Sequence, residues 1–203
     1  MNLNLGDTHL IIEAGRKAGL LRNQLAYVLA TAYHETAHKM KPVREMGGEA
    51  YLKKKKYYPY VGMGYVQLTW DYNYRKAGKF LGVDFISHPK LLLEPKYAVP
   101  ILIEGMKDGW FTGKKLSDYI TLNTSGFVGA RRIINGTDKA DLIAGYAKEY
   151  DALLKHSGYG EDATSAKEMT KEGIIVAAGV SVVAGLWYAL SFIPCNLLGV
   201  LCG

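Results

Sequence analysis

Residues 34–38 read His-Glu-Thr-Ala-His, a group of side chains that could carry metal or acid–base chemistry. In a helix the two histidines would lie four residues apart on one face, where both could bind zinc with Glu35 as general base. The extended zinc-protease motif also needs Gly and His further along, where this chain has Lys41 and Arg44. The next glutamates follow too closely for the usual third ligand. A zinc peptidase is therefore only the alternative hypothesis, and no metal or other cofactor is expected.

Glu35 could instead work with a second carboxylate across a cleft. Cleaving a glycosidic bond needs one acid to protonate the leaving oxygen and one base to activate water. The segment after Glu35 supplies Glu45 and Glu49 as candidate partners. Glu35 also follows Val28 by seven residues, on the apolar face of a predicted helix. That setting favours the protonated carboxyl that a general acid needs.

Aromatic residues are frequent just beyond these carboxylates, and such rings can serve as platforms for sugars. Some of them are expected to belong to the core. The aromatic residues of this segment are Tyr57, Tyr58, Tyr60, Tyr65, Trp70, Tyr72 and Tyr74.

A run of four lysines, Lys53–Lys56, precedes the aromatic segment and contributes to the formal net charge of +6. Lysines next to aromatic residues can indicate nucleic-acid binding, but four adjacent lysines are more typical of a solvated loop. A polyanionic bacterial envelope would attract them equally well. No nucleic-acid partner is expected.

Helical patterns dominate the chain, and no sustained strand alternation is present. Helices are predicted over residues 10–19, 20–37, and 140–156, with a turn leading into a further helix within 66–82. Residues 39–64, rich in Lys, Gly, Pro and Tyr, are expected to be irregular, and Pro89, Pro95 and Pro100 are expected to separate short helices. The fold class is therefore mainly α.

Residues 173–203 contain no Asp, Glu, Lys or Arg. Within them, residues 174–193 form an apolar stretch long enough for a helix of about 30 Å, the thickness of the hydrocarbon core of a bilayer. The chain is thus expected to comprise a catalytic domain over 1–156, a polar linker over 157–172 and a membrane anchor over 173–203. The N-terminus has no signal-peptide pattern, and both cysteines, Cys195 and Cys202, lie in the apolar segment.

Three motifs, AYHETA, YYPYVGMGYVQLTWDYNYRKAG and ARRIINGTD, occur in this order. Together they resemble glycoside hydrolase family 19 chitinase-like enzymes, and especially the short lysozyme-like endolysins of bacteriophages, over roughly residues 8–155. The resemblance implies a lysozyme-like, two-lobed helical domain with a groove. One departure is Met63, which stands where the family usually has Arg or a similar residue.

The resemblance also implies roles for individual residues. Glu35 corresponds to the general acid, and Glu45 is the better match for the base, with Glu49 in reserve. Thr69 takes the place of the Ser or Thr that helps to position the attacking water. The positions that bind sugar in the family are Tyr60, Gln67, Asn73 and Asn135.

The predicted function is that of a glycosidase which cuts β-1,4 bonds of peptidoglycan, or of a chitin-like glycan, by an inverting acid/base mechanism. The absence of disulfides and of longer loops favours peptidoglycan over chitin. The membrane is expected to be a partner through residues 174–193, and the expected location is a viral particle membrane or the host cell envelope. A non-catalytic wall-binding membrane protein is the other alternative.

Overall fold

Residues 1–160 are the part of the chain that the structure, a computed structural model, describes. Met1–Tyr159 form one unit, which extends past the boundary expected at residue 156. Tyr159 is buried in this unit, and its hydroxyl donates to the Leu20 carbonyl at 3.1 Å. Among residues 1–160 there is no helix with the length and apolar character needed to span a membrane. The transmembrane helix predicted over 174–193, the cysteines and most of the predicted linker lie outside the described residues.

The described part of the chain is mainly helical, as predicted. Its α-helices are α1 Thr8–Lys17, α2 Arg22–Glu35, α3 Gly48–Leu52, α4 Asp71–Leu81, α5 Pro95–Lys107, α6 Phe127–Ala130 and α7 Ala140–His156. Short 3₁₀ helices are η1 Pro89–Leu93, η2 Leu116–Asp118 and η3 Arg131–Ile133. Strands β1 Val43–Arg44 and β2 Met63–Gly64 pair antiparallel, with Val43 opposite Gly64 and Arg44 opposite Met63.

Helix α2 is the centre of the fold. Every residue from Leu25 to Ala32 is buried, so the helix is covered on all sides rather than along one apolar stripe. It packs chiefly against α7, and also against α1 and α5. Burial of the α2 core places Glu35, its last residue, at a fixed point where the helix leaves the core.

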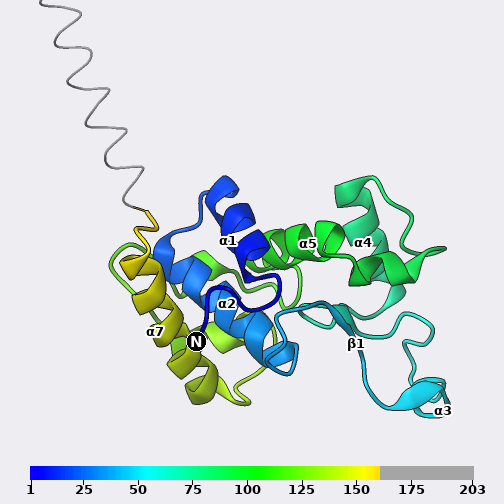
Figure 1. Cartoon of the computed structure of the whole chain (residues 1–203). Coiled ribbons are helices and arrows are strands. Elements are labelled where there is room, and N and C mark those ends of the chain that lie inside the picture. The colour runs from blue at the N-terminus through cyan, green and yellow to red at the C-terminus, as the bar shows by residue number, and fades with distance from the viewer. Residues whose placement is uncertain (161–203) are drawn as a thin grey trace, which may run out of the picture. The chain divides into compact units, whose positions relative to one another are not determined.

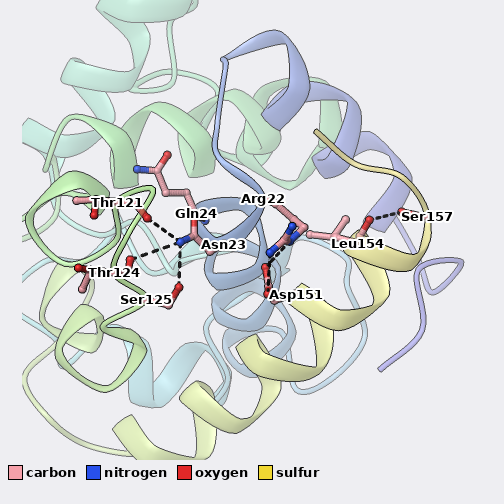
Figure 2. A network of polar contacts seen from close by, with 9 residues as sticks. All are labelled: Arg22, Asn23, Gln24, Thr121, Thr124, Ser125, Asp151, Leu154 and Ser157. Atoms are coloured by element: carbon pink, nitrogen blue, oxygen red, sulfur yellow. Dashed lines mark hydrogen bonds and ion pairs between the residues drawn. The ribbon is translucent and has the colours of Figure 1, made fainter. Parts of the chain in front are cut away.

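The start of α2 is held by polar contacts with two distant parts of the chain (Figure 2). Arg22 pairs with Asp151 of α7 at 2.9 Å. The Asn23 side-chain amide donates to the Thr121 carbonyl at 2.8 Å and to the Ser125 hydroxyl at 2.9 Å. These bonds, made at the end of α2 away from Glu35, fix the helix relative to its neighbours.

Two hydrophobic clusters organise the unit. The larger cluster includes buried residues of α1, α2, α5, α6 and α7. The smaller one includes Leu52, Val61, Met63, Leu68 and residues of α4. In Figure 1, α1, α2 and α7 lie on one side of α5, and α3 and α4 lie on the other.

Two expectations about elements need correction. Pro100 does not separate helices, because it lies inside the continuous helix α5. The proline costs α5 a backbone hydrogen bond, but the helix buries Val99, Ile101 and Leu102 around it, and this packing offsets the cost. The region 39–64 is also not wholly irregular, since it contains β1, α3 and β2.

Candidate active site

Glu35 ends helix α2, and its carboxyl contacts a buried arginine. The Arg131 Nη1 donates to the Glu35 Oε1 at 2.6 Å, with the arginine side chain 4% exposed and the glutamate 18%. The sequence indicated an apolar setting for Glu35, and this expectation is wrong in one respect: a guanidinium lies against the carboxyl. The residue is nevertheless largely screened from water, and only one of its two oxygens is bonded within residues 1–160.

Arg131 is a site residue that the sequence pattern did not indicate. It is the first residue of η3, directly after α6, and its Nε donates to the Asp138 carbonyl at 2.9 Å. The two bonds fix the plane of the guanidinium, and so fix the direction of the Glu35 carboxyl. The only sequence signal was a pair of arginines flanked by apolar residues in the ARRIING motif.

The histidines of residues 34–38 do not form the helical pair that the zinc hypothesis needs. Helix α2 ends at Glu35, and both Ala37 and His38 adopt positive φ angles. His38 stacks on Tyr33, with ring centroids 4.3 Å apart. Among residues 1–160 there is no group of three or more His, Cys, Asp or Glu side chains placed to hold a metal ion. Burial lowers the pKa of His34, so it favours the neutral imidazole beside Glu35.

Glu45 follows β1 and is held by two donors. The Tyr57 hydroxyl donates to Oε1 at 2.6 Å, and the Gly62 N–H donates to Oε2 at 3.0 Å. The Glu45 N–H in turn donates to the Gly62 carbonyl at 2.7 Å, so the backbone is fixed as well. The bond to Glu45 is the main factor that raises the pKa of Tyr57, to about 12. Tyr57 therefore stays a donor to Glu45 throughout the neutral pH range.

Gly62 joins Glu45 to the predicted sugar-binding residue Gln67. A Cβ on Gly62 would lie 2.8 Å from the Gln67 side-chain oxygen and 3.2 Å from its Cβ, so a larger residue here would displace the Gln67 side chain. The Gln67 amide also donates to the Val43 carbonyl at 3.1 Å. Met63, the departure from the family pattern, is a buried residue of the smaller cluster. Glu45 and Gln67 are therefore brought together across the β1–β2 pair.

Thr69 and Asn73 lie close together at the start of α4. The Asn73 side-chain amide donates to the Thr69 carbonyl at 2.9 Å. Within residues 1–160 the Thr69 hydroxyl makes no hydrogen bond, and it is therefore open to a water or a substrate. Trp70 has a positive φ of 74°, and its N–H donates to the Tyr60 carbonyl at 3.0 Å. Four predicted residues, Tyr60, Gln67, Thr69 and Asn73, thus belong to one segment with Glu45.

Asn135 and Glu49 are placed differently. Asn135 is exposed, and its N–H donates to the Arg131 carbonyl at 3.0 Å, so it belongs to the Glu35 side of the site. Glu49 lies in α3, where it pairs with Arg44 at 2.5 Å with its side chain 56% exposed. The reserve candidate for the base is therefore a surface residue neutralised by a neighbour.

The aromatic residues divide into core and surface. Tyr65 and Tyr74 are fully buried and belong to the two hydrophobic clusters. Tyr57 contacts Trp70 edge to face at 5.6 Å, and Trp70 stacks on Tyr72 at 6.1 Å. Trp70 and Tyr72 are 37% and 59% exposed. These three rings, termed here the aromatic strip, lead away from Glu45 and are accessible to a sugar, and Tyr58 is likewise 37% exposed.

We expect Arg131→Lys to lower kcat at least about tenfold with little change in KM. A lysine keeps the charge but cannot hold Glu35 and the Asp138 carbonyl with one planar group. Arg131→Ala should in addition lower the free energy of unfolding by roughly 3–5 kcal/mol, because Glu35 is left without its partner. Steady-state kinetics and chemical denaturation measure the two effects. Arg132→Lys, at the exposed neighbour, is the control, and an equal loss in that variant would contradict the assignment.

The fold of this chain is similar to that of one solved chitinase. The chain superposes on chitinase C from Streptomyces griseus HUT6037 with a TM-score of 0.53, covering 66% of this chain and 60% of that one at 22% identity. At this identity the likeness establishes the fold alone, which is the helical fold that the sequence predicts.

Two curated proteins named as chitinases are similar to this chain in sequence. Over 150 residues the chain is 32% identical to the acidic endochitinase of Dioscorea japonica, covering 66% of this chain and 58% of that protein. Over 126 residues it is 31% identical to chitinase 11 of Oryza sativa subsp. japonica, covering 51% of this chain and 49% of that protein. The chain thus spans about half the length of these relatives. No protein-family model matches it.

Proposed function

We propose that the chain is a glycoside hydrolase that cleaves β-1,4 bonds in a polymer containing N-acetylglucosamine. The observation that carries this proposal is the pair of separately held carboxyl groups, Glu35 on Arg131 and Glu45 on Tyr57 and Gly62. The similarity to proteins named as endochitinases supports the same class of substrate. The aromatic strip adds a surface on which sugar rings can stack.

In the proposed reaction Glu35 is the acid and Glu45 is the base. Arg131 bonds one Glu35 oxygen, and the other delivers its proton to the glycosidic oxygen as the bond to the anomeric carbon breaks. Glu45 takes a proton from the water that attacks the anomeric carbon from the opposite face. The product has the inverted configuration at that carbon, and the two carboxyls return to their starting states by exchanging protons with water.

Thr69 supplies a hydroxyl that can hold the attacking water together with Glu45. We expect Thr69→Ala to lower kcat by roughly tenfold, less than the loss of either carboxyl, because one hydrogen bond to the water is removed and the base remains. Thr69→Ser keeps the hydroxyl and should stay within about threefold of the wild type. Initial rates on a soluble glycan oligomer measure both variants. Equal losses in the two variants would exclude a role for the hydroxyl.

Within this class we propose peptidoglycan as the substrate. Peptidoglycan shares the β-1,4-linked N-acetylglucosamine unit with chitin, and the chain lacks cysteines before residue 195, unlike disulfide-stabilised secreted chitinases. The motifs that resemble phage endolysins agree with a lytic enzyme. We further propose a location on a viral membrane or the host envelope, supported by the uncharged stretch over residues 173–203. Detection of the protein in lysing cells but never in purified particles would exclude the virion.

The test is digestion of purified peptidoglycan by the full chain, kept in detergent, with mass analysis of the soluble fragments. The proposal predicts fragments that end in a new reducing sugar, formed equally with or without a chelator. Fragments that differ by cleaved peptide bonds, lost with the chelator and restored by zinc, would favour the peptidase. Wall binding without any fragments would favour a non-catalytic protein.

A further inference from the structure

We propose that Lys53, Lys54 and Lys56 form a selectivity site for an anionic glycan, a polymer whose branches carry carboxylates, next to the candidate base. The inference rests on the proposed function and specifies its substrate. It concerns the run of residues 53–56, termed here the lysine segment.

The lysine segment is held in place at its first end by α3. Leu52, the last residue of α3, is fully buried in the smaller hydrophobic cluster. The Lys53 N–H donates to the Glu49 carbonyl at 2.9 Å, and the Lys54 N–H to the Tyr51 carbonyl at 3.1 Å. The Lys55 ammonium lies over the Tyr51 ring, 4.1 Å from its centroid. The segment therefore continues α3 as a series of hydrogen-bonded turns.

Its other end leads directly to the candidate base. Tyr58 donates its N–H to the Lys55 carbonyl at 3.1 Å, which closes a further turn. Tyr57, between these residues and the site, donates its hydroxyl to Glu45 at 2.6 Å and contacts Trp70 of the aromatic strip. A glycan stacked on the aromatic strip would thus pass close to the lysine segment.

Among residues 1–160 no carboxylate neutralises the three ammonium groups. Lys53, Lys54 and Lys56 are exposed, and none is in an ion pair within residues 1–160. The neighbouring carboxylates have other partners, since Glu49 pairs with Arg44 and Glu45 accepts from Tyr57 and Gly62.

Some lysines elsewhere in residues 1–160 are neutralised by a carboxylate. Lys17, Lys96 and Lys107 each pair with a nearby glutamate. The lysine segment is therefore a local concentration of positive charge beside the candidate site. Such a patch raises the local concentration of an anionic polymer and its association rate. Neutral chitin has no charge for the lysine segment to attract, whereas the peptide branches of peptidoglycan carry carboxylates that can bind to it.

The test compares two charge-matched triple variants of the full chain. One carries Lys53→Gln, Lys54→Gln and Lys56→Gln, and the control carries Lys90→Gln, Lys114→Gln and Lys148→Gln, at exposed lysines outside the segment. Initial rates are measured on solubilised peptidoglycan and on a neutral chitin oligosaccharide, at about 0.01 M and about 1 M salt, where the screening length is roughly 30 Å and 3 Å.

The expected result is specific to one variant, one substrate and one salt condition. At low salt the segment variant should lose about tenfold in kcat/KM on peptidoglycan, through KM, and stay within about twofold on chitin oligosaccharide. At high salt the difference should disappear, and the control should match the wild type in every condition.

Other outcomes would overturn the inference. They are an equal loss on both glycans, an equal loss in the control variant, or no loss at low salt. Loss of single-stranded DNA binding in the segment variant, with peptidoglycan kinetics unchanged, would assign the lysines to nucleic acid instead. Failure of the proposed function is distinguishable, because the wild type would then hydrolyse neither glycan.

Discussion

Glu35→Gln is expected to reduce glycan hydrolysis by roughly 10²–10⁴-fold, the usual contribution of a general acid. Glutamine has the shape of glutamate and keeps an oxygen that can accept the Arg131 hydrogen bond seen at 2.6 Å. The variant loses the acidic proton, and so it cannot protonate the leaving oxygen. Release of reducing sugar from purified peptidoglycan measures the effect.

Peptidoglycan binding and thermal stability serve as the control measurements for Glu35→Gln. The variant should bind insoluble peptidoglycan as the wild type does, and its melting temperature should stay close to that of the wild type. A fully active variant would remove Glu35 from the mechanism. A variant that has lost both activity and fold would be uninformative alone, and Glu35→Asp, which shortens the side chain but keeps an acid, should then recover part of the rate.

Glu45→Gln is expected to have the second largest effect, roughly 10²–10³-fold on kcat. Its carboxylate is fixed by Tyr57 and Gly62 beside Gln67, and an amide cannot take the proton of the attacking water. Glu49→Gln is the matched control, since Glu49 is an exposed residue whose ion pair with Arg44 contributes at most about 1 kcal/mol. That variant should stay within about threefold of the wild type.

The two glutamates therefore separate the candidates that the sequence left open. If Glu49→Gln lost most of the activity and Glu45→Gln stayed active, Glu49 would be the base. The hydrogen bond from Tyr57 would then not mark the catalytic carboxylate. Azide, a small external nucleophile, should partly restore the rate of Glu45→Gln, because it can attack without needing the base. Azide should not restore Glu35→Gln on the same glycan, whose leaving oxygen still needs a proton.

The long helices were predictable because their apolar spacing is strong. The pattern over residues 140–156 predicts α7 with its bounds, and the apolar residues Ile143, Ala147, Tyr150 and Leu154 at helical spacing are buried. The pattern in α2 correctly predicted a helix, but it predicted only one apolar face. The middle of α2 is in fact buried on every side. Complete burial depends on what α1, α5 and α7 contribute, and a local pattern does not contain that information.

Short elements and the inner contacts of the site were not predictable in this way. The two residues of β1 are a strand only because Gly64 and Met63 lie opposite, about twenty residues further along the chain. The Glu35–Arg131 pair joins residues 96 positions apart, and no spacing rule links them. The motif over residues 57–78 contains Gln67, Thr69 and Asn73, and Glu45 lies in the loop before it. The Tyr57 hydrogen bond to Glu45 and the contact of Gln67 with Gly62 depend on the folded backbone.

The most direct test of the proposed mechanism is the configuration of the newly formed reducing end. Proton NMR spectra would be recorded during the first minutes of hydrolysis of a β-1,4-linked N-acetylglucosamine oligomer by the full chain, before the anomers equilibrate. Attack by a water held at Glu45 while Glu35 protonates the leaving oxygen predicts that the α-anomer appears first. Initial formation of the β-anomer would contradict this two-carboxylate inverting mechanism.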